Sequence, residues 1–410
     1  MKKFLILPLC FLLIFTSCVP INNNDDPEPT EISERTENRY LIGAWIYYNE
    51  IQDLVESTDS EEEFEQSVRE KIGILKEYGV NTIFLHNRAF DDAFYKSNIF
   101  PVSQYCNDKD GNLKFDVLSA FVKIGHELGV EIHAWINPYR IRKDSDIDKI
   151  AEGSLPYNWY SENPSNQRLI ICDNGIYYNP ASIEAQKRII DCIREILDNY
   201  NVDGIHFDDY FYPDTSPTID SDFYNEYVNS GGFLTLSDYR RQCVNTLISS
   251  VYSLIKSYGD DLCFSISPSA NIDNDYNSCF ADVRLWASEK GYVDYLIPQI
   301  YFGFLHEQMP FESVLNEWSA FESDFVKIAV GIPLYKIGQK DIYAKSGVDE
   351  WINNSDIISR QINLILNDSN IDGYVYYSGS YLYNSDLSDS EKNELSNIKE
   401  ILLSENCIFP

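Results

Sequence analysis

The sequence predicts a (β/α)8 TIM barrel with long loops on the C-terminal face of the barrel. Eight apolar, strand-like runs alternate with eight amphipathic, helix-like stretches. The turns from helix to strand are a few residues long, whereas several loops from strand to helix are much longer. No GxGxxG pattern follows the first strand, which disfavours a doubly wound nucleotide-binding sheet.

The N-terminus is typical of a bacterial lipoprotein signal. A basic start precedes an apolar run from Phe4 to Phe15, which is too short to span a bilayer as a permanent helix. Small residues then lead to a cysteine. We therefore expect a signal peptide over residues 1–17, lipidation of Cys18 and attachment to a membrane of the cell envelope. An ordinary secretory signal with a chance cysteine is the alternative.

The rest of the chain divides into a linker and a barrel. Residues 18–38 are polar and rich in Asn, Pro and acidic side chains, which predicts a flexible acidic linker. Residues 39–405 suffice for one barrel with loop insertions. The strand-like runs are 41–47, 80–86, 130–136, 202–207, 262–268, 293–301, 326–333 and 371–377. The helix-like stretches are about 61–78, 115–128, 182–199, 236–258, 279–289, 310–322, 355–367 and 389–403. The long loops are 87–114, 137–181, 208–235 and 334–354.

The composition excludes some classes of function. A formal net charge of -33 with no run of Lys or Arg leaves no basic face for a phosphate backbone, so we expect no nucleic-acid partner. Nine cysteines occur without a CxxC pair, and their spacing indicates neither a zinc finger nor a disulfide framework.

The segment VDGIHFDDYFYP carries the most informative chemistry. Alternation along a strand places Ile205 and Phe207 on one face. The opposite face carries His206, Asp208 and Tyr210. An ionised Asp is rarely buried without a partner or a task. We expect Asp208 to be the catalytic carboxylate, as a nucleophile or as the stabiliser of a positively charged sugar centre.

A second carboxyl is needed for most glycosidase mechanisms. Asp209 follows directly, and we expect it to point sideways and to act as the acid/base or as an orienting partner. Two carboxyl groups this close push the pKa of one upward. No carboxylate stands at another strand end, so further partners are sought on neighbouring loops. The candidates are Glu50, Asp91, Asp92, Asp273 and Asp275.

Polar and aromatic side chains at the other strand ends suit a neutral polyhydroxyl ligand. If the apolar face of each strand packs on the helices, these side chains line the mouth of the barrel. The residues expected to bind substrate are Arg88, Trp135, Asn137, Tyr139, Arg140, His206, Tyr210, Gln299, Tyr301, Tyr335 and Tyr377. Aromatic rings stack on the apolar faces of sugars while amides and hydroxyls bond their edges, so we expect a glycan substrate.

Three histidines on adjacent strands also face inward by this alternation. His86, His133 and His206 could ligate zinc together with Asp208. No HxH or HExxH spacing accompanies them. We therefore expect hydrogen-bonded barrel histidines with no metal and no cofactor.

Seven blocks of the chain resemble, in order, those of the glycosyl hydrolase-like family 10 proteins. They are GVNTIFLHNRAFDDAFYKSNIFPVSQY, ELGVEIHAWINPYRI, YYNPASIEAQKRI, VDGIHFDDYFYP, SISPSANI, ADVRLWASEKGYVDYLIPQIYFGF and DGYVYYSGSYL. The resemblance spans about residues 40–385 and implies a barrel glycoside hydrolase, frequently a lipoprotein. It also implies a peptidoglycan-type substrate, because some relatives act on glycan strands stripped of their peptides. The first strand departs from the pattern, since Gly43 stands where an Arg often precedes the Trp.

The resemblance also bears on individual site residues. It places Asp208 and Asp209 in the acidic motif of the fourth strand. The residues that fall in the blocks lining the cleft are Arg88, Asn137, Arg140, Gln299 and Tyr301. DGIHFDDY is also similar to the DGxDxDxE signature of family 18 chitinase-like barrels, in which the N-acetyl group of the substrate acts as nucleophile. Here His206 and Tyr210 replace two of the acids of that signature.

Three functions fit these observations. The first is a glycoside hydrolase acting on a denuded peptidoglycan or a related amino-sugar glycan. The second is a non-catalytic, glycan-binding surface lipoprotein, which the lack of a second carboxylate at a strand end supports. The third is a metal-dependent deacetylase or amidase built on the inward histidines.

Overall fold

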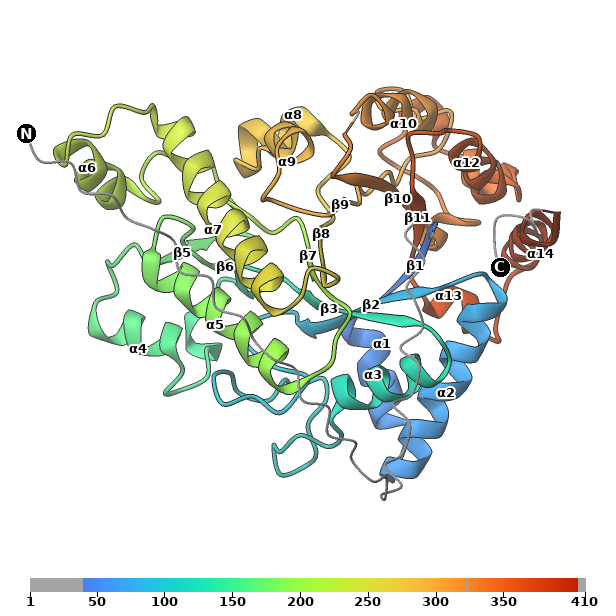
Figure 1. Cartoon of the computed structure of the whole chain (residues 1–410), viewed down its shortest axis with the longest axis horizontal. Coiled ribbons are helices and arrows are strands. Elements are labelled where there is room, and N and C mark those ends of the chain that lie inside the picture. Colours follow the sequence, from blue (N-terminus) through green and yellow to red (C-terminus); the bar gives the residue numbers. More distant parts are fainter. Residues whose placement is uncertain (1–39, 322, 405–410) are drawn as a thin grey trace, which may run out of the picture. The chain divides into compact units, whose positions relative to one another are not determined.

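The computed structural model describes residues 40–321 and 323–404. The expected signal peptide, Cys18 and the linker lie outside the described residues. In the described part, eight parallel strands close into a barrel in the order β1-β11-β10-β9-β8-β7-β3-β2, with helices around them (Figure 1). The strands are β1 (Leu41–Ile46), β2 (Thr82–Arg88), β3 (Glu131–Ile136), β7 (Gly204–Phe207), β8 (Cys263–Ile266), β9 (Tyr295–Leu296), β10 (Lys327–Pro333) and β11 (Gly373–Tyr377). The predicted (β/α)8 barrel is confirmed.

Helices of two kinds surround these strands. The helices that follow the eight barrel strands in turn are α2 (Glu61–Glu77), α3 (Val117–Glu127), α5 (Ile183–Asn199), α7 (Leu236–Tyr258), α9 (Val283–Ser288), α10 (Phe311–Ser319), α12 (Ile357–Leu366) and α14 (Asp389–Ser404). Shorter helices lie in the loops after the strands: α1 (Tyr48–Glu56), α4 (Leu155–Glu162), α6 (Ser221–Asn229), α8 (Ile272–Asn274), α11 (Glu350–Asn353) and α13 (Ser380–Tyr383). Side-chain caps begin several of the helices, as at Ser60, Ser182 and Thr235.

Two hydrophobic layers hold the barrel together. The larger layer packs the outward faces of the strands, with Ile205 and Phe207 among them, against the helices. The smaller layer fills the barrel with aromatic side chains that include Trp45, Phe84 and Trp135. Gly43 on β1 makes room for this filling, because a Cβ there would lie 2.8 Å from the Phe84 ring.

The long loop after β3 folds into a small sheet, which the sequence analysis missed. Strands β4 (Arg140–Arg142), β5 (Leu169–Cys172) and β6 (Gly175–Tyr178) pair antiparallel in the order β4-β6-β5. The strand predicted over 293–301 is also shorter than expected, since β9 covers two residues before Pro298. Proline has no N–H for the ladder, and the chain beyond it keeps isolated bridges at Gln299.

No helix within residues 40–321 and 323–404 is long and apolar enough to cross a membrane.

Candidate active site

Strand β7 carries the chain to the mouth of the barrel. Ile205 and Phe207 face the helices and are fully buried, and His206 points into the barrel, as the alternation predicts. The strand ends at Phe207, so Asp208 and Asp209 stand at its C-terminal end, where barrel enzymes place their chemistry. The chain bends at Asp209.

A pocket of about 190 Å³ opens above this strand end. Seven of the residues lining it were predicted from the sequence as catalytic or substrate-binding: Trp135, Asp208, Asp209, Tyr210, Gln299, Tyr301 and Tyr377. The side chain of Asp209 was expected to point sideways, but Asp209 lines the same pocket as Asp208. The bend after the strand ends the strict alternation of side chains, which is why both carboxyl groups reach the pocket.

Trp45 and Ser267 complete the lining of this pocket. Neither stood among the residues we predicted to bind substrate. The signal for Trp45 was present, since Trp45 alternates with Ile42, Ala44 and Ile46 and so lies on the inward face of its strand. The break with the family pattern at Gly43 obscured it.

His206 forms the floor beneath the pocket. The Trp45 Nε1–H donates to His206 Nε2 at 3.0 Å, which leaves the ring proton on Nδ1, where it donates to Ser265 Oγ at 2.8 Å. Burial holds the pKa of His206 well below its usual value. Both ring nitrogens are therefore occupied in a neutral, fully buried side chain. His206, predicted to bind substrate, is not among the residues that line the pocket.

Asp208 is the carboxylate that its neighbours favour in the ionised form. Its Oδ1 accepts the backbone N–H of Asp209 at 2.8 Å and Gln299 Nε2 at 3.2 Å. Burial raises the pKa of Asp208, but hydrogen bonds from Asp209 and the positive charge of Arg140 oppose this rise.

Asp209 is the carboxyl that its neighbours favour in the protonated form. Burial raises the pKa of Asp209 well above its usual value, and the adjacent charge of Asp208 raises it further. The two side chains hydrogen-bond to each other. The directions of these two shifts favour a proton on Asp209 next to an ionised Asp208.

Asp275 supplies a further carboxyl from the loop after the next strand, β8. It begins a π-helical turn (Asp275–Cys279) and accepts Ser269 Oγ at 2.8 Å. Burial raises the pKa of Asp275 to about 7, and its other oxygen has no hydrogen-bond partner among the described residues. The charge of Asp275 helps to raise the pKa of Asp209. It is the candidate partner from the sequence whose charge acts on the Asp208–Asp209 pair.

The other four candidate carboxyls have other partners or line another pocket. Asp91 pairs with Arg188 and accepts Tyr178 Oη. Asp273 pairs with Arg284 at the surface. Glu50 accepts Tyr383 Oη at 2.5 Å, and burial raises the pKa of Glu50 to about 7. Asp92 lines the second pocket described below.

Several of the residues that line the pocket are aromatic and pack on one another or on aromatic neighbours. Tyr377 stacks on Tyr301, with ring centroids 5.5 Å apart, and Tyr335 packs edge-on against both rings. Trp135 stacks flat on His86, with ring centroids 3.7 Å apart, so the indole is held in one orientation. Trp135 Nε1 has no hydrogen-bond partner among the described residues, although it is buried. It is therefore free to donate to a ligand.

Three of the residues predicted to bind substrate lie behind the pocket. Arg88 is fully buried and donates to the carbonyls of Asn137 and Pro138. A register shift between His86 and Arg88 turns Arg88 out of the inward series. Asn137 bonds His86 and Ala89, and Tyr139 is fully buried in the hydrophobic layer.

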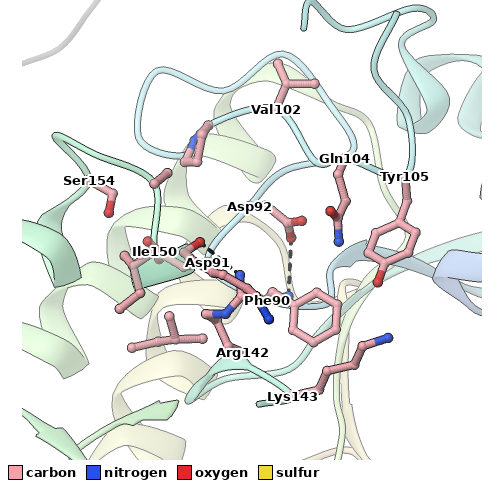
Figure 2. Close-up of a pocket in the computed structure, with 14 residues that line it drawn as sticks. Phe90, Asp91, Asp92, Val102, Gln104, Tyr105, Arg142, Lys143, Ile150 and Ser154 are labelled. Carbon is pink, nitrogen blue, oxygen red and sulfur yellow. Dashed lines mark hydrogen bonds between the residues drawn. The ribbon is translucent and has the colours of Figure 1, made fainter. Parts of the chain in front are cut away.

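A second pocket of about 190 Å³ lies among the loops after β2 and β4 (Figure 2). Its lining includes aromatic, acidic and basic side chains: Phe90, Asp91, Asp92, Pro101, Val102, Gln104, Tyr105, Ile141, Arg142, Lys143, Lys149, Ile150, Ala151 and Ser154. Arg140 contacts one residue of each pocket. Its guanidinium lies 4.7 Å from the Phe90 ring of this pocket and 3.9 Å from the Tyr210 ring of the first.

The described residues contain no group of three or more His, Cys, Asp or Glu side chains arranged to hold a metal ion. The inward histidines each have a different environment. His86 bonds Asn137, His206 bonds Trp45 and Ser265, and His133 lies 3.7 Å from Glu131 at the start of its strand.

Two known proteins are similar to this chain in sequence. The chain is 28% identical over 348 residues to glycosyl hydrolase DigH of Escherichia coli (strain K12), covering 78% of this chain and 76% of that protein. It is 28% identical over 315 residues to glycosyl hydrolase YngK of Bacillus subtilis (strain 168), covering 71% of this chain and 59% of that protein.

Two solved structures share the fold at 12% identity. The first is alpha-L-fucosidase isoenzyme 2 from Paenibacillus thiaminolyticus, with a TM-score of 0.59 over 90% of this chain and 50% of that chain, so the match spans half of that protein. The second is the PgaB (BpsB) glycoside hydrolase domain from Bordetella bronchiseptica, with a TM-score of 0.51 over 87% of this chain and 98% of that chain.

The sequence profile described as Glycosyl hydrolase-like 10 matches residues 41–351, which include both members of the carboxyl pair and most of the barrel. This chain therefore belongs to the glycosyl hydrolase-like 10 family.

Proposed function

We propose that this protein is a glycoside hydrolase that cleaves glycans containing N-acetylated amino sugars, with Asp208 and Asp209 as its catalytic residues. The observation that carries the proposal is the hydrogen-bonded pair of carboxyls at the end of β7, which lines an aromatic pocket and whose pKa shifts favour a proton on Asp209. A glycosidase needs one carboxyl that is ionised and one that is protonated.

The closeness of the two carboxyls favours a mechanism assisted by the substrate. Retaining glycosidases hold their two carboxyls about 5 Å apart, and inverting ones about 6.5–9.5 Å apart. Asp208 and Asp209 bond each other directly, so neither arrangement fits them. An N-acetyl group on the sugar can act as the nucleophile in their place.

In this mechanism the two residues act in turn. Asp209 donates its proton to the glycosidic oxygen while the C1–O bond breaks and the acetamido oxygen of the substrate bonds C1. The Asp208 carboxylate accepts the acetamido N–H and stabilises the positive charge of the cyclic oxazolinium ion. Water then attacks C1, the Asp209 carboxylate takes its proton, and the bond from C1 to the acetamido oxygen breaks. The sugar leaves with retained configuration.

The rest of the pocket supports a sugar ligand. Tyr301, Tyr377 and Trp135 offer ring faces, and the indole N–H of Trp135 is unpartnered among the described residues. The Gln299 amide already donates to Asp208 and to the Ser267 carbonyl, so it holds the catalytic carboxylate in place. Burial of the pair strengthens each of these electrostatic contacts.

Denuded peptidoglycan is the substrate that the family resemblance supports, and the assisted mechanism makes a sharp prediction for it. The mature protein should release reducing ends from N-acetylated strands, and chemical removal of the acetyl groups should abolish this release. Re-acetylation of the same strands should restore it. Binding without any release of reducing ends would instead favour the glycan-binding function. Equal cleavage of deacetylated strands would contradict substrate assistance.

We also propose that the protein acts at the cell envelope through a lipid on Cys18, which lies outside the described residues. The apolar N-terminal run and the cysteine that follows it support this location. Cys18→Ala should move the protein from the membrane fraction to the soluble fraction or block removal of the signal. Fractionation with immunoblotting measures both. A Cys18→Ala variant that stays membrane-bound and is processed normally would rule out the lipid anchor.

A further inference from the structure

Arg140 differs from the other buried arginines of the described residues in that its side chain has no bonded partner. The described arginines with at most 9% exposure are Arg88, Arg140, Arg240 and Arg241. Arg88 donates to backbone carbonyls, Arg240 pairs with Asp220, and Arg241 pairs with Asp238. The side chain of Arg140 makes no hydrogen bond or ion pair with any residue in the described part of the chain, and its Nε is closed off from solvent. A buried donor without a partner is costly, and the unbonded N–H groups of Arg140 are available to a ligand.

Arg140 contacts an aromatic residue of each pocket. Its guanidinium lies 3.9 Å from the centre of the Tyr210 ring and 4.7 Å from the centre of the Phe90 ring. Contacts with the rings do not use the N–H groups, which lie in the plane of the guanidinium. Packing against two rings also restricts the rotamers of Arg140, so less freedom is lost when a ligand binds.

The carboxylates of the protein itself do not occupy this edge. Burial raises the pKa of Asp208 and the charge of Arg140 opposes this rise, yet no ion pair joins the two. Asp91, on the neighbouring loop, is already bonded by Arg188 and Tyr178. The planar fork of an arginine matches a carboxylate, which accepts two parallel N–H bonds.

We propose that Arg140 binds the carboxylate of an acidic sugar unit that lies next to the bond being cleaved. This inference rests on the proposed function and narrows its substrate to glycans with a carboxylate on the neighbouring sugar. The lactyl ether of an amino sugar and a hexuronic acid both present this group.

The second pocket provides room for that neighbouring sugar. Phe90 both covers Arg140 and lines this pocket, together with Tyr105 and the side chains of Asp92 and Gln104 (Figure 2). Lys143 also lines it and makes no ion pair with the described residues. Polar groups beside aromatic faces are what a sugar subsite requires.

Aromatic rings connect the two pockets without a break. Tyr377, in the catalytic pocket, contacts Tyr47 with ring centroids 6.1 Å apart, and Tyr47 contacts Tyr48 at 5.7 Å. Tyr48 then packs on Tyr105 of the second pocket at 4.7 Å and on Phe90 at 5.5 Å. A glycan chain could therefore rest on ring faces from one pocket to the other.

The charge of the whole protein makes a specific cation necessary for such a ligand. A net charge of -33 repels an acidic glycan at long range. A neutral glycan needs no buried guanidinium at this position. Arg140 and Lys143 together supply the local positive charge that an acidic sugar needs.

The test compares matched substrates in matched variants. The substrates are denuded strands with the lactyl carboxylate free, the same strands with this carboxylate reduced to an alcohol, and an N-acetylated glycan that carries hexuronic acid. The variants are Arg140→Gln, Arg140→Lys and Arg194→Gln. Arg194 is the control, because it lies on α5 outside both pockets and its guanidinium is already held by Asp191.

The wild-type kcat/KM should be about tenfold to a hundredfold higher for the free carboxylate than for the alcohol. This ratio should fall to about one in Arg140→Gln, fall partly in Arg140→Lys, and persist in Arg194→Gln. A wild-type ratio of one, or a ratio that survives in Arg140→Gln, would overturn the proposal. If Arg140 only tunes the charge of Asp208, its replacement should slow both substrates equally and leave the ratio intact. Activity on the uronic acid glycan distinguishes the two sources of the carboxylate.

A binding measurement separates this inference from the proposed function. Calorimetry with the Asp208→Asn protein and uncleaved oligosaccharides should show the same carboxylate preference in Kd, and Asp208→Asn combined with Arg140→Gln should lose it. A preference in Kd without wild-type turnover would support Arg140 while contradicting the hydrolase. Turnover of the glycan with no carboxylate preference in kcat/KM or in Kd would support the hydrolase and contradict the role of Arg140.

Discussion

Asp208→Asn should reduce the turnover of an N-acetylated glycan by about a hundredfold to ten-thousandfold. The change keeps the shape of the side chain and removes the negative charge that stabilises the oxazolinium ion. The Asn Oδ1 can still accept the two bonds that Asp208 Oδ1 accepts, from the Asp209 N–H and Gln299 Nε2. The fold and glycan binding should therefore survive.

The measurements for Asp208→Asn are reducing-end release, glycan binding and a thermal melt. Asp273→Asn is the matched control, because Asp273 is largely exposed and pairs with Arg284 outside the pocket. The control should keep near-normal turnover. A folded Asp208→Asn protein that also turns over at a near-normal rate would rule out Asp208 as a catalytic residue.

Asp209→Asn should show an effect that depends on the leaving group. A sugar alkoxide leaves only with a proton, so loss of the acid should reduce glycan cleavage by about a hundredfold to ten-thousandfold. An aryl glycoside of the same amino sugar with a weakly basic phenol needs little protonation, and its cleavage should fall far less. Steady-state rates on the two substrates measure the difference. Equal losses on both would contradict the role of Asp209 as the acid.

The same variant should not lose stability at neutral pH. The pKa of Asp209 is raised in the folded protein, so the stability that this carboxyl contributes is present at low pH and is lost as the pH rises toward its folded pKa. Asn cannot ionise, so the Asp209→Asn protein does not lose this stability as the pH rises. The Asp209→Asn protein should melt at the wild-type temperature or above it, so its slow turnover would reflect lost chemistry and not lost folding.

Much of the fold could be predicted because the sequence repeats one unit. Each unit has an apolar strand, a polar loop and an amphipathic helix, and eight such units leave few other topologies. The small sheet β4-β6-β5 could not be predicted in the same way. Its strands have three or four residues, too few to show a period, and their pairing depends on contacts between distant parts of one loop.

The candidate site could be predicted where strands stay regular. Alternation correctly brought Trp135, Asp208 and Tyr377 to the pocket, because each lies within a strand or directly at its end. It failed for Arg88, beyond a register shift, and for Asp209, at a bend. Side chains alternate between two faces only while the backbone remains extended. The active-site residues of a barrel lie where the extended strands end, so alternation predicts their directions poorly.

The role of Asp275 could not be predicted from spacing. It was one of five loop acids with no signal to separate them, and only the turn after β8 brings it to Asp209. The orphaned donors of Arg140 and Trp135 are likewise visible only in three dimensions, since they depend on which neighbours are absent among the described residues.

The pH dependence of kcat/KM tests most directly the central claim that Asp208 is ionised while Asp209 holds the proton. The wild-type profile should be bell-shaped, with an acid limb from Asp208 and an alkaline limb from Asp209. With the aryl glycoside, Asp209→Asn should remove the alkaline limb. Asp275→Asn should move that limb to lower pH, because a charge that raises the pKa of Asp209 is lost. An alkaline limb that persists unchanged in Asp209→Asn would contradict the account.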